Sequence, residues 1–372
     1  MKILYLFLIF YTLSLSRISK AALSFEDHAF PEFITSSRAL AMGNAYICKV
    51  DDSWSAFYNP AGLGTVRDGN FQLINAHAEA SNGMLEAIGK GPAIDVPGKY
   101  IETRDQDEMR QSLIGHEDKL AHSRYNLFPN ITVRGMTLGY MYSHRDRAIL
   151  NSTTATTNPG YFEVAERTDS GPVFALNASL FGGVIKVGAS AVYLNRVELN
   201  ESYAPASFPV TVNNSDYKSG KSLQVTAGAR LTLPIALLPT FAAVLHNATD
   251  NDFEDASKGG LPTAIKQTFD VGFSLTPQIG KTVRLHLEAN LKDVNDAYET
   301  DIKRRAAAGM ELDFNRRLFL RAGLGDGWGS GGLGVRSGAF TLDLTTYAVD
   351  RSLDGFREEE DRRYVFSFST GF

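Results

Sequence analysis

The sequence predicts an all-β protein, a transmembrane antiparallel β-barrel of about 14 strands, and two observations lead to this prediction. From residue 124 to the C-terminus, polar and apolar residues alternate in short segments, with no helical stretch between them. Short turns alternate with long polar loops along the same region, which is typical of outer-membrane barrels. A closed barrel also removes the exposed edges that a large open sheet would carry.

Composition and charge agree with this fold class. Charged residues make up 21% of the 372 residues, which is too polar for a helical membrane protein. The 33 glycines and 11% aromatic residues suit tight bends and interfacial rings. The net charge of −5 without a basic cluster argues against nucleic acid as a partner. The single cysteine, Cys48, cannot form an internal disulfide and is expected to be a buried small side chain.

The first 22 residues have the features of a secretory signal peptide. Lys2 supplies the positive charge, and residues 3–15 form an apolar stretch too short to span as an anchor. Small residues suitable for cleavage follow at 19–22. We therefore expect residues 1–22 to be a cleaved signal and the mature protein to be exported without transmembrane helices.

Residues 36–64 are rich in small residues and turns, unlike the rest of the chain. Asp52 can cap a one-turn helix over 53–58, and Asn59 before Pro60 ends it, because the residue before proline disfavours the α region. Gly62 and Gly64 then allow a tight backbone. Such a compact, kinked segment is a poor strand and a poor long helix, and its natural place is inside another structure.

Three parts of this segment resemble the N-terminal segment of the FadL-like outer-membrane transporter superfamily, which also contains the PorV-type barrels of secretion systems. They are residues 38–45, the Asp51–Asp52 pair, and residues 58–63. One departure is Ser37, where the pattern usually carries glycine. The resemblance implies that residues 23–66 form a hatch that plugs a barrel formed by residues 67–372. It places the hatch motif at Asn59, Pro60, Ala61 and Gly62, with Arg38 and Asp52.

The resemblance also implies a function and a location. FadL-like members carry hydrophobic or small molecules passively across the outer membrane of Gram-negative bacteria, and the hatch gates the route. The runner-up is a PorV-like barrel that conducts nothing and docks a secreted or surface protein through outer loops such as residues 200–221. Neither role requires a cofactor.

The barrel region divides into a first strand, an insertion and a long series of further strands. The first strand is predicted at 70–79, and an insertion at about 80–122, with a helical tract over 103–120, lies in the lumen or at one mouth. Adding the first strand to those that follow gives 15, and because bacterial barrels have an even number we expect 14. The following strands are predicted at 124–134, 136–149, 161–168, 173–181, 184–199, 222–233, 240–247, 264–276, 282–292, 305–314, 318–324, 331–336, 339–349 and 363–372.

Polar faces of these strands are predicted to point into the lumen. Opposite charges on adjacent strands can then pair, and Arg38 is a plausible partner for Glu311 or Asp313. This wall could line a wet channel, hold the hatch shut, or only fill and stiffen the barrel. The predicted lumen-facing polar residues are Arg284, His286, Glu288, Glu311, Asp313, Arg321 and Asp343.

The last strand has an aromatic face that ends on the final residue. It looks like the signal by which the barrel-assembly machinery recognises outer-membrane barrels, so this machinery and outer-membrane lipid are expected partners. The residues of that signal are Tyr364, Phe366, Phe368 and Phe372.

Reactive chemistry is not predicted. The seven histidines lack the spacing of a metal site, and no nucleophile motif is present, so an enzyme is the least favoured class. The acidic loop 250–255 lacks the glycine and distal glutamate of a calcium loop. Residues 323–334 are glycine-rich without the lysine of a phosphate loop, and we interpret them as tight turns between strands.

Overall fold

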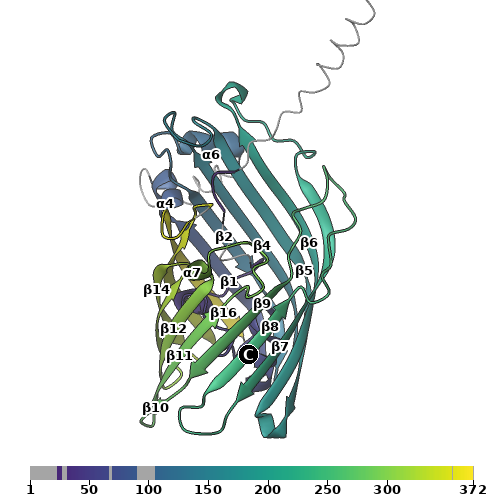
Figure 1. The fold of residues 1–372 in the computed structure, drawn as a ribbon, viewed down its shortest axis with the longest axis vertical. Coiled ribbons are helices and arrows are strands. Elements are labelled where there is room, and N and C mark those ends of the chain that lie inside the picture. The colour runs from purple at the N-terminus through teal and green to yellow at the C-terminus, as the bar shows by residue number, and fades with distance from the viewer. Residues whose placement is uncertain (1–22, 27–31, 67–68, 90–104, 354, 372) are drawn as a thin grey trace, which may run out of the picture.

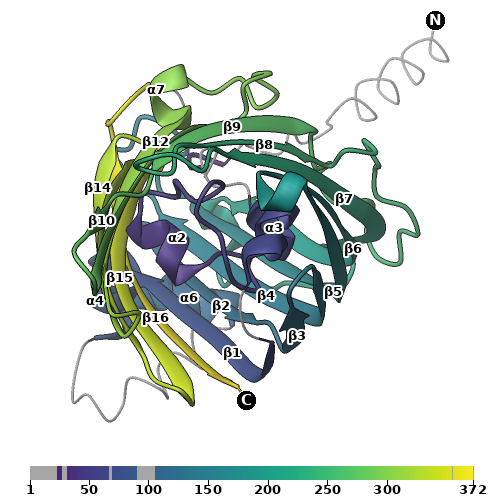
Figure 2. The same cartoon turned by 90° about the horizontal axis from the view of Figure 1, so that it is seen from below.

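The computed structural model describes residues 23–26, 32–66, 69–89, 105–353 and 355–371. The strands form one antiparallel sheet that closes on itself, because the last strand pairs with the first (Figures 1 and 2). The predicted signal peptide and Phe372 lie outside the described residues.

The helices are short and the strands long. The helices are α2 (Ser37–Ala41), α3 (Ser55–Tyr58), α4 (Asn82–Ile88), α6 (Gln106–Ser112) and α7 (Ile302–Arg305), with 3-10 helices η1 (Pro60–Thr65), η3 (Phe181–Gly183) and η4 (Pro205–Ser207). The strands are β1 (Asn70–Ser81), β2 (Ala121–Leu127), β3 (Asn130–Val133), β4 (Met136–Leu150), β5 (Phe162–Leu180), β6 (Ile185–Tyr203), β7 (Lys218–Thr232), β8 (Thr240–His246), β9 (Thr268–Leu275), β10 (Gln278–Ile279), β11 (Val283–Leu291), β12 (Ala306–Phe314), β13 (Leu318–Gly325), β14 (Trp328–Arg336), β15 (Phe340–Asp350) and β16 (Glu360–Gly371).

These strands form 14 staves, where a stave is one position around the barrel, made either of one strand or of two consecutive short strands. This number confirms the predicted barrel. β2 and β3 follow one another between β1 and β4, and β9 and β10 follow one another along β11. The fifteenth predicted strand was wrong because residues 161–168 and 173–181 are both part of β5. Gly171 and Pro172, which separate them, lie within the strand; only the pairing with β6 is interrupted there, since proline has no N–H to donate.

The two ends of the barrel differ as predicted. Tight turns around residues 181–184, 315–317 and 337–339 lie at one end, which we call the turn end. Long connections such as 151–161 and 204–217 lie at the other, the loop end (Figure 1).

A belt of exposed apolar side chains surrounds the barrel. A belt of this kind is expected where strands face lipid, and the polar alternate residues then point inward. Each stave contributes at least one exposed apolar side chain to it, namely Leu73, Ile131, Leu138, Phe174, Tyr193, Leu223, Phe241, Phe273, Leu287, Met310, Leu320, Leu333, Leu344 and Phe366. In the part of the chain that the structure describes, no helix has the length and apolar character needed to cross a membrane.

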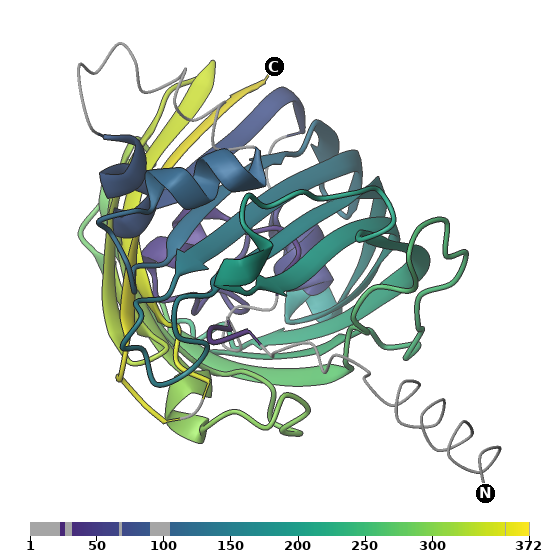
Figure 3. The ribbon, with the colours of Figure 1, turned by 90° about the horizontal axis from the view of Figure 1, so that it is seen from above.

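The described part of the insertion lies at the loop end, against the outside of the wall. Met84 of α4 and Met109 of α6 pack in one apolar cluster with Phe162, Val164 and other outward-facing residues of the upper strands. The connection between β6 and β7 contributes Val210 to the same cluster. Figure 3 shows these helices at the mouth of the barrel.

Candidate functional site: the segment inside the barrel

Residues 32–66, which we call the inner segment, lie in the lumen and carry α2, α3 and η1 (Figure 2). Almost all of its side chains are buried. The prediction that Asp52 caps a helix over 53–58 was wrong: α3 begins at Ser55, and its N-cap position is Trp54, without a side-chain cap. Asp52 instead accepts a hydrogen bond from the Trp54 N–H at 3.1 Å, in the turn before the helix. Asn59 is extended, with φ −163°, and therefore ends α3.

Asn59 joins two parts of the inner segment. Its side-chain oxygen accepts from the Ala61 N–H at 3.0 Å and so caps η1, in which Pro60 occupies the first position. Its amide nitrogen donates to the Ile47 carbonyl at 2.9 Å. Both amide atoms are thus used inside a buried segment, which explains why asparagine suits this position.

Arg38 connects the inner segment to the wall. Its guanidinium donates two hydrogen bonds to the carboxylate of Glu311 on β12, at 2.7 and 2.8 Å. The same group donates to Asp51 at 2.7 Å, to Asp52 at 3.2 Å and to the Tyr46 hydroxyl at 2.9 Å. Burial raises the pKa of Asp51, but the charges of Arg38 and Lys49 outweigh it and hold this pKa below its usual range. The buried guanidinium therefore faces ionised carboxylates on both sides.

The wall continues this network across three strands. Arg321 of β13 lies between Glu311, at 2.8 Å, and Asp343 of β15, at 2.5 Å. On β11, Glu288 accepts from the backbone N–H of Cys48 at 2.8 Å and lies 2.9 Å from His286 Nε2.

The remaining predicted lumen residues, Arg284 and Asp313, are register partners that line a polar cavity. That cavity lies at the turn end.

Cys48 itself is buried, and burial raises the pKa of its thiol, so it stays protonated.

Apolar packing holds the other side of the inner segment. Phe57 and Trp54 contact Phe128, with ring centroids 4.9 and 5.9 Å away. Inward-facing Val173 and Val192 of β5 and β6 belong to the same cluster. The lumen wall is therefore polar on the β11–β15 side and apolar on part of the β4–β6 side.

Glycines in the wall allow the inner segment to approach closely. A Cβ on Gly323 would lie 2.2 Å from the Met42 carbonyl carbon, and one on Gly309 would lie 2.4 Å from the Met42 oxygen. On β7, a Cβ on Gly228 would lie 2.1 Å from the Asn59 side chain. Our interpretation of residues 323–334 as tight turns was wrong: only Asp326 and Gly327 form a turn. The other glycines lie in β13 and β14, and two of them, Gly323 and Gly325, meet the backbone of Met42 and Gly43.

Two cavities lie on opposite sides of the inner segment. One of about 400 Å³ at the turn end is polar and is lined by Arg38, Asp51 and Asp52 together with wall residues. The other, of about 90 Å³, faces the loop end and is largely apolar. Its apolar lining is Phe33, Ile34, Ile47, Phe57, Tyr58 and Ile265, and charged residues that include Lys292 and Asp270 lie around it. The packed inner segment separates the two cavities.

The last strand presents its aromatic face outward. Tyr364 and Phe366 are exposed, Phe368 is half-buried, and β16 closes the barrel against β1.

Solved structures match this architecture, whereas no protein-family model and no curated protein matches the sequence. The Pseudomonas putida toluene transporter TodX matches with a TM-score of 0.53 at 11% identity, covering 92% of this chain and 100% of that one. The CymD monoaromatic hydrocarbon channel matches with 0.53 at 10% identity, covering 92% and 99%. A Pseudomonas aeruginosa FadL homologue matches with 0.49 at 11% identity, covering 95% and 99%. The chain therefore shares the barrel fold of TodX and CymD.

Two further wall residues, which are not among the predicted lumen-facing residues above, also hold the inner segment. Arg230 of β7 donates to the carbonyls of Cys48 and Val50, at 2.9 and 3.1 Å. Ser330 of β14 accepts from the Gly43 N–H at 2.8 Å and donates to the Ala41 carbonyl at 3.0 Å. The alternation of polar and apolar residues along β7 and β14 predicts that both side chains point inward. Their partners, however, lie roughly 180 and 290 residues away in the sequence, so only the fold determines them.

Proposed function

We propose that the chain is an outer-membrane channel for passive uptake of small hydrophobic molecules, with the inner segment as its gate. The exposed apolar belt and the closed sheet support insertion in a bilayer. The FadL-like fold, shared with two hydrocarbon channels, supports transport of apolar molecules. The observation that supports gating most directly is the position of the inner segment between an apolar cavity and a polar one.

The chemistry of the two cavities suggests the direction of the route. An apolar molecule gains free energy by leaving water for the cavity at Phe33, Phe57 and Ile265, on the loop side. It gains nothing from the polar cavity, from which it can leave to water. The step between them requires the inner segment to shift, because Arg38 and its carboxylates fill the path.

Uptake into liposomes tests this function. Full-length protein is reconstituted, and entry of toluene is compared with entry of a polar solute of similar size, using empty liposomes as the background. Deletion of residues 36–64 should raise entry of both solutes, since it joins the two cavities. Toluene entry equal to the background in both the intact and the deleted protein would contradict a transport role.

The same samples separate transport from docking. A PorV-like barrel would stay sealed and would co-purify with a protein bound to its loop end. Deletion of the connection at 204–217 should then release that partner while leaving toluene entry unchanged.

A further inference from the structure

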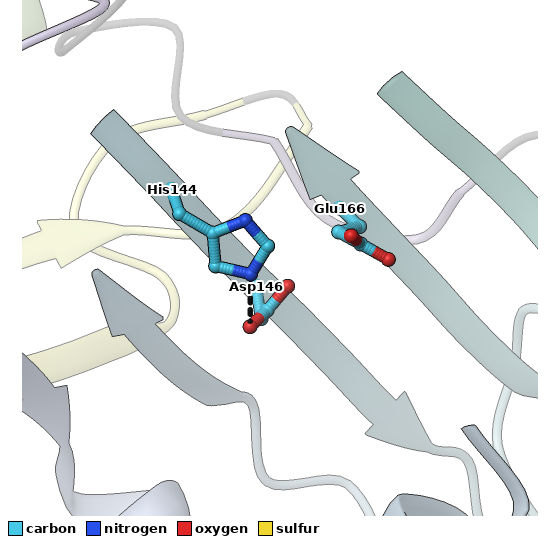
Figure 4. A group of neighbouring side chains, drawn as sticks. All are labelled: His144, Asp146 and Glu166. Carbon is cyan, nitrogen blue, oxygen red and sulfur yellow. Dashed lines mark hydrogen bonds and ion pairs between the residues drawn. The ribbon is translucent and has the colours of Figure 1, made fainter. Parts of the chain in front are cut away.

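Three metal-ligating side chains meet on the outer surface of the barrel, away from the inner segment. His144 and Asp146 lie two residues apart on β4, and Glu166 lies on β5 (Figure 4). They share the outward face with Leu138 and Tyr140 of the apolar belt, toward the loop end. In the part of the chain that the structure describes, this is the one group of three such residues whose potential ligand atoms all lie within 4.8 Å of one another.

The strand register brings these groups together. Asp146 is the direct partner of Glu166 across the ladder, and His144 is the partner of Thr168. The ligand atoms of the three side chains all lie within 4.8 Å of one another, with Nε2 of His144 2.9 Å from Asp146. Ligand atoms in a tetrahedral Zn²⁺ site, each about 2.0–2.2 Å from the ion, lie about 3.3–3.6 Å apart, so the side chains would close in by roughly 1 Å on binding.

Asp146 and Glu166 face each other on neighbouring strands, so a cation bound between them would interact with both carboxylates at once. The site is also shielded from water, which strengthens such an attraction. His144 is 6% exposed, and the Tyr125 ring lies 4.9 Å from the imidazole. Tyr217, from the connection that covers the outer wall, donates its hydroxyl proton to Glu166 at 2.8 Å.

The imidazole already has the partner that a metal ligand needs. In this structure Nε2–H of His144 donates to Asp146 at 2.9 Å, and Nδ1 lies 2.8 Å from the Thr168 hydroxyl. A metal ion at Nε2 would replace that proton, and Nδ1–H would then donate to the Thr168 oxygen. An imidazole with two carboxylates favours first-row transition metals over Ca²⁺, which takes six to eight oxygens.

From this geometry we infer that His144, Asp146 and Glu166 bind a divalent transition-metal ion of the Zn²⁺ class on the outer wall. The ion links β4 to β5 and, through Glu166 and Tyr217, holds the 204–217 connection against the barrel. Three protein ligands leave one position for water or for the Tyr217 oxygen. This site does not depend on whether the barrel transports anything.

Metal binding to the full-length protein in detergent tests the inference. After treatment with a chelator and dialysis, the protein is titrated with Zn²⁺, and bound metal is counted by elemental analysis. One ion per chain should bind, and excess Ca²⁺ should not displace it. Co²⁺ in its place should give visible absorption bands that report nitrogen and oxygen ligands.

Variants assign the ion to these residues. Asp146→Asn and Glu166→Gln keep the side-chain shape and should abolish stoichiometric binding, as should His144→Asn. Thr168→Val should weaken binding by about 10–100-fold, because it removes only the orienting hydroxyl. The control is His246→Asn, a histidine that also lies beside a carboxylate, 3.4 Å from Asp270, and it should bind as the original protein does.

Two results would contradict a metal site at His144, Asp146 and Glu166. Absence of bound Zn²⁺ in the original protein, or unchanged binding in a folded Asp146→Asn protein, would show that the cluster is only a hydrogen-bonded group. Heat-dependent gel migration confirms that each variant is folded, and the isosteric variants keep the test valid if His144→Asn does not fold.

Discussion

At the scale of single residues, Arg38 makes the ion pair that joins the inner segment to β12 of the wall. Its guanidinium is buried and bonds both Glu311 of the barrel and Asp51 of its own segment. Removal of one partner from a buried ion pair costs about 3–5 kcal/mol, because the other charge is left unpaired. Loss of this side chain should therefore weaken the contact between the inner segment and the wall.

Reversal of this charge should loosen the inner segment, which is the proposed gate. Arg38→Glu places a fourth carboxylate beside Glu311, Asp51 and Asp52, and we expect liposome permeability to rise several-fold or more. Arg362→Glu is the matched control, since Arg362 is a partly exposed residue that pairs with Glu360 on the same strand. Equal leakage through both variants and the original protein would show that Arg38 does not hold the gate.

At the scale of elements, the glycines of β12 and β13 are the counterpart of α2. The Met42 backbone lies where a side chain on Gly309 or Gly323 would otherwise be. A strand normally avoids glycine, which has no side chain to pack and costs conformational entropy. Here the close approach of the inner segment offsets that cost.

Gly323→Val should displace α2 without opening the barrel. Valine favours a strand, but its branched side chain meets the Met42 backbone, and overpacking of this kind costs about 1–3 kcal/mol. Permeability should rise while the heat-dependent gel shift is retained. Gly329→Val is the control, because a Cβ there meets nothing within 4 Å. A sealed Gly323→Val protein would mean that the inner segment adapts to the larger residue.

At the scale of the whole molecule, closure of β16 on β1 leaves the sheet without a free edge. Each of the 14 positions around the barrel is then hydrogen-bonded to a neighbour on both sides, as a membrane requires. The exposed belt is stable only in lipid or detergent.

A closed barrel of this kind should resist detergent denaturation in the cold. We expect the unheated protein to migrate faster on a denaturing gel than the boiled protein, since the folded barrel stays compact. Truncation before residue 360 removes β16 and should abolish the fast band. One band at the unfolded position at every temperature would contradict a closed barrel in the isolated protein.

The sequence by itself determined the barrel, its turn end and loop end, and which face of each strand points inward. These properties depend on alternation and turn residues, which are local along the chain. The one miscounted strand shows the limit of that local signal, because Gly171 and Pro172 look like a turn but pair with β4 throughout.

Only the tertiary structure decided which residues distant in sequence meet, both in the lumen and on the outer wall. Arg38 meets Glu311 across 273 residues, Gly323 receives Met42, and His144 meets Glu166 through the register of two long strands. Residues 323–334 resembled turns in the sequence, because the backbone that Gly323 and Gly325 meet lies about 280 residues away along the chain. Contacts of this kind depend on the closure and register of the sheet, which no local pattern specifies.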